Sequence, residues 1–435
     1  MQQPAAHSVE PAAAPTATGS RRRLWIGLTI LGLVLALLVI SLALFVRARQ
    51  SSQADVLWRY PTDSIDPSAQ PASGGTAVVS ADDALLGLDA GTGSQRWRLD
   101  REVSDVVVDG DRIYAGCCRE SDSGPSSILA VDAADGTIRW QVDRGNAGRS
   151  ISISFAPVTP VGDRVVVSSN DDEVFALDAD TGKQLWSVSA PVFGTPAVSG
   201  QVVAISGYGR AIGIDLATGA TKWEFTTDPA LELSEPVALG GDFVFTSSVD
   251  VMSPDEPEVP PSVFALNAKT GSRSWEHRTD AVQLTPPVLS DNLVVTGVHK
   301  SFDGQDLGVL AFDGTSSKPL WEASDLGQVD TPVVGPSRIY VAPQGNAGVV
   351  ALDPGNGAVS WEYRFDESGP GPIILTSELV WVGGDEDELV GFTPDSGTVN
   401  QQYQADSAIV SLAADRDTLF LGTYLDGLFA LDAGG

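Results

Sequence analysis

The stretch ALDADTGKQLW, residues 176–186, decides the fold, because it recurs in altered form along most of the chain. Seven copies lead from a turn to a tryptophan, and an eighth tryptophan precedes the first copy: Trp58, Trp97, Trp140, Trp186, Trp223, Trp275, Trp321 and Trp361. A further copy has Gln401 at this place, and residues 430–433 form a truncated last copy. The mean spacing of about 43 residues is typical of a β-propeller with one four-stranded blade per repeat.

Each repeat contains the parts of one blade. The apolar runs 165–167 and 174–177 predict two neighbouring strands. Residues 178–182 predict a turn, because Asp and Thr side chains bond to nearby backbone and Gly tolerates a positive φ. Trp186 then begins the outer strand, and its fixed place in the repeat predicts an indole wedged between neighbouring blades. Trp381 and Phe243 fall on second strands, where we expect core residues.

The turn and its tryptophan resemble the repeats of the pyrroloquinoline-quinone (PQQ) enzyme superfamily, whose corner reads Ala-x-Asp-x-x-x-Gly-x-x-x-Trp. The same repeat occurs in non-enzymatic, BamB-like propellers. The resemblance covers residues 55–435 and implies an all-β fold with a single propeller. Related propellers usually have eight blades, whereas the repeats of this chain count nine, so both numbers remain open at this point.

The two ends of the repeat region predict how the ring closes. Residues 55–60 look like an outer strand without a blade of its own. Residues 408–412, 419–422 and 428–432 look like three strands that lack a fourth. We expect the two ends to pair, because a closed ring has no exposed sheet edge at that point.

The N-terminal region predicts a membrane anchor. Residues 1–23 form a polar tail that we expect to be disordered. Residues 24–46 carry no charge, and a helix of this length, about 34 Å, would cross a hydrocarbon core of about 30 Å. The alternative is a cleaved signal peptide, whose apolar region is usually about 7–15 residues long. Residues 47–54 would be a linker and residues 55–435 the propeller.

Charge predicts orientation and the kind of partner. Arg21, Arg22 and Arg23 precede the expected span and two arginines follow it, which favours a cytoplasmic N-terminus in the plasma membrane. The resemblance implies an extracytoplasmic propeller. The net charge of −31 disfavours nucleic acid and anionic lipid and favours cationic partners.

The adjacent Cys117 and Cys118 are the most unusual dipeptide. Neighbouring Cα atoms lie about 3.8 Å apart, below the usual 4.4–6.8 Å of a disulfide, so a bond between them would be strained. Quinoprotein alcohol dehydrogenases carry such a pair against their quinone, although there it precedes the strand that begins a blade. Here it ends a second strand, so we expect a structural or reduced pair and keep PQQ binding as an alternative.

Other candidate groups give no catalytic set. The acidic clusters 171–173 and 385–388 fall at strand-linking turns, where we expect solvated side chains, with calcium binding as the alternative. His7 lies in the tail, His277 follows an outer-strand tryptophan, and His299 is expected in a long loop. Two cysteines and three histidines exclude a zinc finger, a Cys-x-x-Cys-His haem site and a recognisable hydrolase triad. We therefore assign no catalytic residue and no metal ligand and expect no cofactor.

Long loops predict the binding face. Residues 116–127, 249–262 and 298–308 join second to third strands, and in a propeller these loops share a face with the blade-to-blade connections. The resulting hypothesis is a non-catalytic scaffold of the bacterial cell envelope that binds an envelope protein or peptide on this face. The alternatives are a PQQ-dependent dehydrogenase, with PQQ and calcium, and a ligand- or ion-binding sensor.

Overall fold

The computed structural model describes residues 52–62, 68–81, 83–117, 126–144, 158–169, 172–190, 193–234, 237–239, 242–251, 259–299, 307–344, 348–365, 370–384, 387–415 and 417–433. The chain divides into Met1–Ser51 and Ser52–Gly435. The first unit, with the expected span 24–46, lies outside the described residues. Within the described ranges, no helix is long and apolar enough to cross a membrane.

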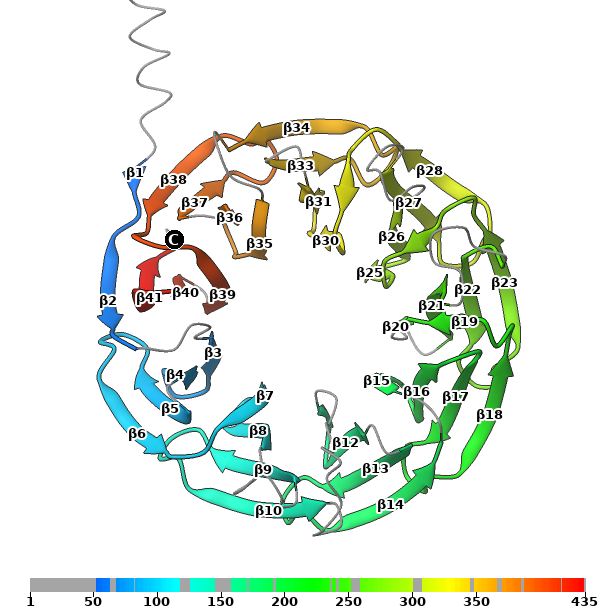
Figure 1. The fold of residues 1–435 in the computed structure, drawn as a ribbon, viewed down its shortest axis with the longest axis horizontal. Coiled ribbons are helices and arrows are strands. Elements are labelled where there is room, and N and C mark those ends of the chain that lie inside the picture. The colour runs from blue at the N-terminus through cyan, green and yellow to red at the C-terminus, as the bar shows by residue number, and fades with distance from the viewer. Residues whose placement is uncertain are drawn as a thin grey trace, which may run out of the picture. The chain divides into compact units, whose positions relative to one another are not determined.

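Consecutive blades follow one another round a ring (Figure 1), each with its first strand innermost. The first four blades are β3 (Ser68–Ala72), β4 (Thr76–Ala81), β5 (Ala84–Asp89) and β6 (Gln95–Leu99); β7 (Val103–Asp109), β8 (Arg112–Cys117), β9 (Ser126–Asp132) and β10 (Ile138–Arg144); β11 (Thr159–Val161), β12 (Arg164–Ser169), β13 (Glu173–Asp178) and β14 (Gln184–Ser189); and β15 (Phe193–Ser199), β16 (Val202–Gly207), β17 (Arg210–Asp215) and β18 (Thr221–Thr226).

The next three blades have an inner strand in two pieces. The fifth comprises β19 (Leu231–Leu233), β20 (Val237–Leu239), β21 (Phe243–Asp250), β22 (Ser262–Asn267) and β23 (Arg273–Arg278). The sixth comprises β24 (Gln283–Leu284), β25 (Val288–Ser290), β26 (Leu293–His299), β27 (Leu307–Asp313) and β28 (Pro319–Ala323). The seventh comprises β29 (Gln328–Val329), β30 (Val333–Val334), β31 (Ile339–Val341), β32 (Pro343–Gln344), β33 (Gly348–Leu352) and β34 (Val359–Arg364).

The last two blades close the ring. The eighth comprises β35 (Pro370–Leu375), β36 (Val380–Gly384), β37 (Glu388–Phe392) and β38 (Val399–Gln404). The ninth combines β39 (Ile409–Asp415), β40 (Thr418–Thr423) and β41 (Gly427–Asp432) with β2 (Val56–Tyr60) from the other end of the chain. Trp58 of β2 pairs with Ala430 of β41 in an antiparallel register. The predicted closure is thereby confirmed, and the number of blades is nine, one more than the resemblance implied.

Ser52 and Gln53, which we expected in the linker, form β1 and lie parallel to β38 of the eighth blade. The Ala54 amide then donates to the Gln402 carbonyl at 2.8 Å, and the chain crosses to the ninth blade as β2. The N-terminal segment therefore bridges the eighth and ninth blades, beside the place where Gln401 replaces the repeat tryptophan.

The hydrophobic core is divided among the seams between blades. Nine clusters of buried residues each join two neighbouring blades. The cluster around Trp186, for example, joins Val166 and Ala176 of the third blade to Val203 and Ile214 of the fourth. Since each blade buries apolar side chains on both of its faces, its central strands are nearly continuous hydrophobic runs, as Val165–Val167 shows.

Each repeat tryptophan bonds to the next blade. The Trp186 Nε1–H donates to the Leu216 carbonyl at 2.9 Å, and the other seven indoles donate to the matching turn of their neighbour at 2.8–3.1 Å. A Cβ on Gly219, whose φ is +74°, would lie 2.7 Å from the Trp186 side chain. Glycine is therefore required for the positive φ and for the close approach of the indole.

The corner aspartate holds the same turn. Asp178 Oδ1 accepts from the Thr181 amide at 2.9 Å and from Thr181 Oγ1 at 2.7 Å. These bonds lower the pKa of Asp178, with the Thr181 hydroxyl as the largest cause. The motif thus forms a capped turn on which the tryptophan of the preceding blade packs. Its polar atoms form hydrogen bonds that hold the turn and the seam between blades.

Candidate functional site

The two faces of the ring differ in what they expose. We call the face with the second-to-third strand connections the loop face and the face with the Asp-x-x-Thr-Gly turns the corner face. On the loop face, Tyr208 between β16 and β17 is 58% exposed, and Tyr424 and Leu425 between β40 and β41 are 46% and 71% exposed. Exposed large apolar side chains at hairpin tips are available to contact a partner.

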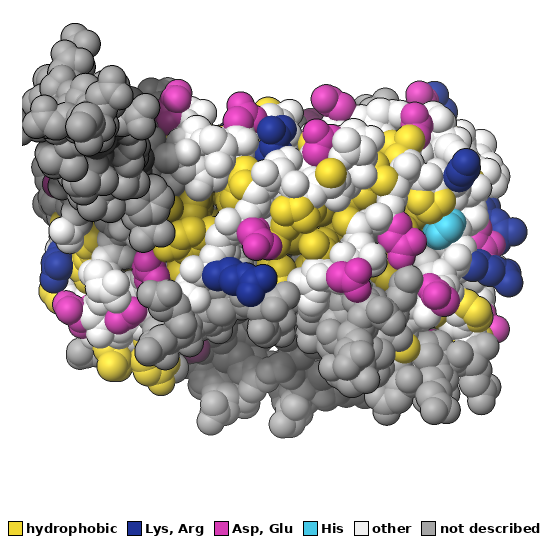
Figure 2. Space-filling model, turned by 90° about the horizontal axis from the view of Figure 1, so that it is seen from above, with side chains coloured by type: hydrophobic (Ala, Val, Ile, Leu, Met, Phe, Trp, Pro, Cys, Tyr) yellow, Lys and Arg dark blue, Asp and Glu magenta, His cyan; other side chains and the backbone are white. Residues whose placement is uncertain are grey.

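The rim of the ring exposes a second group of apolar side chains. Figure 2 shows hydrophobic side chains gathered in a band on this side of the molecule, with acidic and basic side chains around them. Around the whole rim, the exposed large apolar side chains of outer strands include Leu185, Leu320 and Val359, each close in sequence to a repeat tryptophan. In three other blades the residue before the tryptophan is basic and pairs with the corner aspartate: Arg96 with Asp89, Arg139 with Asp132, and Lys222 with Asp215.

Proline interrupts the inner strands beside the loop face. In the sixth blade Pro286 and Pro287 separate β24 from β25, because proline cannot donate to the ladder. Side chains replace the missing bonds. Thr285 Oγ1 accepts from the Gly297 amide at 2.8 Å, and Thr296 Oγ1 donates to the Thr285 carbonyl at 2.7 Å. These bonds keep the interrupted strand attached to β26.

Buried hydroxyls also connect successive blades at this level. Ser206 Oγ of the fourth blade donates to the Ser234 carbonyl of the fifth at 2.5 Å. Ser247 Oγ of the fifth lies 2.9 Å from Ser234 Oγ and 2.9 Å from the Thr285 carbonyl of the sixth. Ser206 and Ser247 are almost completely buried. The fourth, fifth and sixth blades are thus connected at the level where the inner strands of the fifth and sixth are interrupted.

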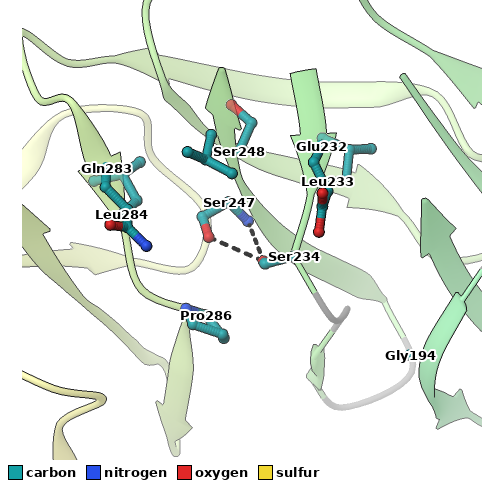
Figure 3. A pocket seen from close by; sticks show the side chains of 10 residues that line it. Gly194, Glu232, Leu233, Ser234, Ser247, Ser248, Gln283, Leu284 and Pro286 are labelled. Carbon is teal, nitrogen blue, oxygen red and sulfur yellow. Dashed lines mark hydrogen bonds between the residues drawn. The ribbon is translucent and has the colours of Figure 1, made fainter. Parts of the chain in front are cut away.

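A cavity of about 300 Å³ opens where these strands are interrupted. Figure 3 shows its walls: Glu232, Leu233 and Ser234 from the fifth blade's inner strand and the residues that follow it, Ser247 from β21, and Leu284 and Pro286 from the sixth blade. The volume lies at the lower end of the range of small-molecule sites. The lining combines apolar side chains with hydroxyls and one carboxylate.

Glu232 is the ionisable group of this lining. Burial raises the pKa of its carboxyl, and a hydrogen bond from the Tyr208 side chain opposes that rise. The two residues come from neighbouring blades and are joined by a backbone bridge, while the Gly209 amide donates to the Leu231 carbonyl at 2.7 Å. The hairpin that carries Tyr208 is therefore fixed to the strand that carries Glu232.

Neither described histidine lies in this lining. His299 is the last residue of β26 and not part of a loop as expected, because its backbone pairs with Leu307 and Gln283. Its Nε2 lies 2.9 Å from the Val329 carbonyl of the seventh blade. His277 lies on β23, with Nδ1 3.0 Å from the Ser317 carbonyl and its ring against Phe312. Both side chains contact the next blade, and His7 lies outside the described residues.

The other predicted positions are spread over the ring. Cys117 ends β8, and Cys118 lies outside the described residues, so the pairing of the two sulfurs stays a prediction. Glu173 and Glu388 begin third strands, and Asp171, Asp385 and Glu386 lie outside the described residues. Trp381 is fully buried, and Phe243 is partly buried against the fifth-to-sixth seam. In the described part of the chain, no three His, Cys, Asp or Glu side chains are grouped as metal ligands.

The fold and its repeats match one family in particular. A family model described as outer membrane protein assembly factor BamB matches residues 46–250 and 209–433. The chain belongs to this family. It is 26% identical over 297 residues to BamB of Burkholderia pseudomallei (strain K96243), which covers 64% of this chain and 72% of that protein. It is 27% identical over 271 residues to BamB of Yersinia pestis, which covers 58% of this chain and 64% of that protein.

Related folds extend beyond the BamB family. The quinohemoprotein alcohol dehydrogenase ADH IIB of Pseudomonas putida is 24% identical over 384 residues, which covers 74% of this chain and 47% of the enzyme. Among solved structures, BamB of Moraxella catarrhalis aligns with a TM-score of 0.52 at 17% identity, over 77% of this chain and 97% of that chain. The designed protein Ika8 aligns with a TM-score of 0.55 at 14% identity, over 78% and 99%. These two structures show the fold alone.

The residues of the cavity were not singled out by the sequence. The segments Ser234-Glu235-Pro236 and Thr285-Pro286-Pro287 could have indicated interrupted inner strands, since proline cannot donate to a ladder. The isolated Gly207-Tyr208-Gly209 could have indicated an aromatic side chain at a hairpin tip. Their proximity depends on the register between two blades.

Proposed function

We propose that this BamB-family propeller is a non-catalytic scaffold of the cell envelope that binds another envelope protein or a peptide on its loop face. The observation that carries the proposal is that a cavity and three exposed large apolar side chains, Tyr208, Tyr424 and Leu425, lie on that face. The relatives named BamB are described as outer membrane protein assembly factors. Their names support an envelope partner for this chain.

The division of roles between the two faces supports the same proposal. On the corner face, aspartate, threonine and indole groups bond within the ring, as Asp178, Thr181 and Trp140 do around one turn. The chain enters the ring beside this face, where the Asp432 amide donates to the Asp55 carbonyl at 2.9 Å. The loop face lies at the other ends of the strands, and its exposed apolar side chains can contact a partner.

We further propose that residues 24–46 anchor the protein in the plasma membrane with a cytoplasmic N-terminus and an extracytoplasmic propeller. The uncharged length of this segment and the arginines on both sides of it support the proposal. Fractionation of cells that express the full-length chain tests it. Extraction from membranes by detergent but not by high salt or carbonate is expected, and release by carbonate would contradict the anchor.

Partner capture tests the scaffold. The full-length protein, cross-linked in its native cells and purified, should enrich one or a few envelope proteins. A variant with Tyr208→Ala, Tyr424→Ala and Leu425→Ala should lose them, because it removes the apolar side chains of the loop face. Lys183→Ala, a change on the corner face, is the matched control. Equal recovery with the triple variant and the control would contradict the proposal.

The similarity to a quinohemoprotein alcohol dehydrogenase favours one alternative, a PQQ-dependent enzyme. The distinguishing test adds PQQ and calcium to the full-length protein. Saturable binding followed by alcohol-dependent dye reduction would establish the enzyme. No binding of PQQ at concentrations that load a known quinoprotein is the result that we expect for a scaffold.

A further inference from the structure

The Glu232 cavity combines a partly desolvated carboxylate with an apolar wall. Leu233, Leu284 and Pro286 supply apolar surface, and Ser234 and Ser247 supply hydroxyls. The hydroxyls are held by bonds between blades, as the 2.9 Å contact of Ser247 Oγ with the Thr285 carbonyl shows. The cavity is therefore built by the fixed backbone of three blades and does not need a partner in order to form.

In the described part of the chain, the carboxylate of Glu232 has no cationic neighbour that shifts its pKa. Only burial and the Tyr208 hydrogen bond shift its pKa, and no Lys or Arg of the described residues contributes. On the adjacent hairpin the situation differs, because Arg210 pairs with Glu224 at 3.1 Å. A partly buried carboxylate without a counter-charge is unfavourable for folding, and a cation placed beside it would gain from the low local dielectric constant.

The carboxylate also keeps hydrogen-bonding capacity. An ionised carboxylate offers about four acceptor positions, and the Tyr208 side chain uses one of those on Glu232. Tyr208, whose side chain bonds to Glu232, is 58% exposed, so its ring can contact a cation or an aliphatic stem that reaches this carboxylate. A long basic side chain meets both requirements, because its methylene stem packs on apolar surface while its head group reaches a carboxylate.

We propose that the cavity receives a lysine or arginine side chain of the bound partner, with Glu232 as the counter-ion and Tyr208 and Leu284 beside the aliphatic stem. The inference deepens the proposed function and rests on it, because it names the chemistry that the loop face recognises. The strongly negative protein, with a net charge of −31, would also attract such a partner over a distance. A cavity of about 300 Å³ suits one side chain and not an extended cofactor.

Two isosteric probes separate charge from shape. N-acetyl-L-arginine amide and its neutral counterpart N-acetyl-L-citrulline amide are titrated into the full-length protein in mild detergent, with ligand-observed NMR as the readout. The arginine probe should bind saturably and the citrulline probe about tenfold or more weakly, since hydrogen bonds to a charged partner are the stronger ones. Equal binding of both probes, or saturable binding of neither, would overturn the proposal.

Matched variants assign the effect to Glu232. Glu232→Gln should weaken arginine-probe binding by about tenfold or more. Glu362→Gln, which removes one exposed carboxylate from the outer strand β34, should leave it unchanged. A melting temperature of Glu232→Gln at or above that of the wild type will show that the ring is intact. Unchanged probe binding in Glu232→Gln would assign the cation to another site and overturn the proposal.

Partner capture separates this inference from the scaffold itself. If wild-type protein enriches an envelope partner and Glu232→Gln enriches it equally, the cavity is not the recognition site, although the scaffold stands. If Glu232→Gln loses the partner and Glu362→Gln keeps it, both are supported. If wild-type protein enriches no partner at all, the scaffold fails whatever the probes show.

Discussion

Trp381 and Gln401 lie in the same row of the eighth blade, with only Gly391 between them. In the first and fourth blades this row holds a tryptophan on the outer strand, and the third-strand glycine lies beneath its indole, as Gly87 lies beneath Trp97. In the eighth blade Trp381 comes from the second strand and joins the cluster between the eighth and ninth blades. The indole of this seam therefore comes from the second strand of the blade and not from the outer strand, which accounts for the loss of tryptophan at position 401.

Exchange of the two positions tests this account. Trp381→Ala should lower the free energy of unfolding by roughly 3–5 kcal/mol, because it empties a fully buried site. Gln401→Trp alone should lower the free energy of unfolding by about 1–3 kcal/mol, because two indoles would compete for the space over Gly391. The double variant should be more stable than Trp381→Ala. Thermal melts of the four proteins measure the coupling, and strictly additive effects would contradict the account.

Two glycines with positive φ separate backbone strain from contact with the indole. Gly219 has a φ of +74°, and a Cβ there would lie 2.7 Å from Trp186, whereas Gly200 has a φ of +58° and no atom within 4 Å of its Cβ position. Gly200→Ala should lower the free energy of unfolding by about 1–2 kcal/mol, because alanine must then adopt the left-handed conformation without any new contact. Gly219→Ala should lower the melting temperature clearly more, because it also displaces the indole. Equal melting temperatures would show that the indole does not need this platform.

The lowered pKa of a corner aspartate predicts that the protein loses stability in acid. Lys222, and then Thr218, lower the pKa of Asp215 to about 2. Because the folded pKa lies below the ordinary value of 3.8 for an aspartate, the stabilisation is present above about pH 4 and is lost as the pH falls through about 2. Asp215→Asn should thus melt below the wild type at pH 6, and the difference should shrink between pH 4 and 2. A difference that does not depend on pH would argue against the Lys222 pair as its source.

Glu232 should behave in the opposite way. Burial raises the pKa of its carboxyl, so protonation favours the folded state and ionisation at neutral pH disfavours it. Glu232→Gln should therefore melt at the same temperature as the wild type or higher at pH 7, and any gain should disappear as the pH falls below the folded pKa. A residue that opposes folding is expected at a binding site. A lower melting temperature at pH 7 would indicate a structural role instead.

The repeat could be predicted from the sequence because it depends on local spacing. The 43-residue period, the turn at residues 178–182 and the unpaired strand at 55–60 each follow from residue types at fixed distances. Their combination predicted the all-β propeller and its closure, and counting the repeats gave nine blades. The family expectation of eight did not fit, because every repeat unit takes its own place in the ring.

The cavity and the exchanged tryptophan could not be predicted in the same way. Both depend on register, which is a property of strand pairs and not of one segment. Tyr208 and Glu232 come from neighbouring blades, and their pairing depends on how these blades are aligned. Trp381 takes the place of the tryptophan that is missing at position 401 only because Gly391 pairs with both Trp381 and Gln401. Likewise, Ser52 and Gln53 are polar residues in a linker-like context, and only the position of β38 shows that they form a strand.

Site-specific photo-cross-linking tests the central claim most directly. A benzophenone amino acid is placed at Tyr208 on the loop face or, as the control, at Lys183 on the corner face of the full-length protein, and cells are irradiated. If the loop face is the binding surface, position 208 should give a discrete adduct with an envelope protein and position 183 should give none. Adducts from position 183 alone, or the same adducts from both positions, would contradict it.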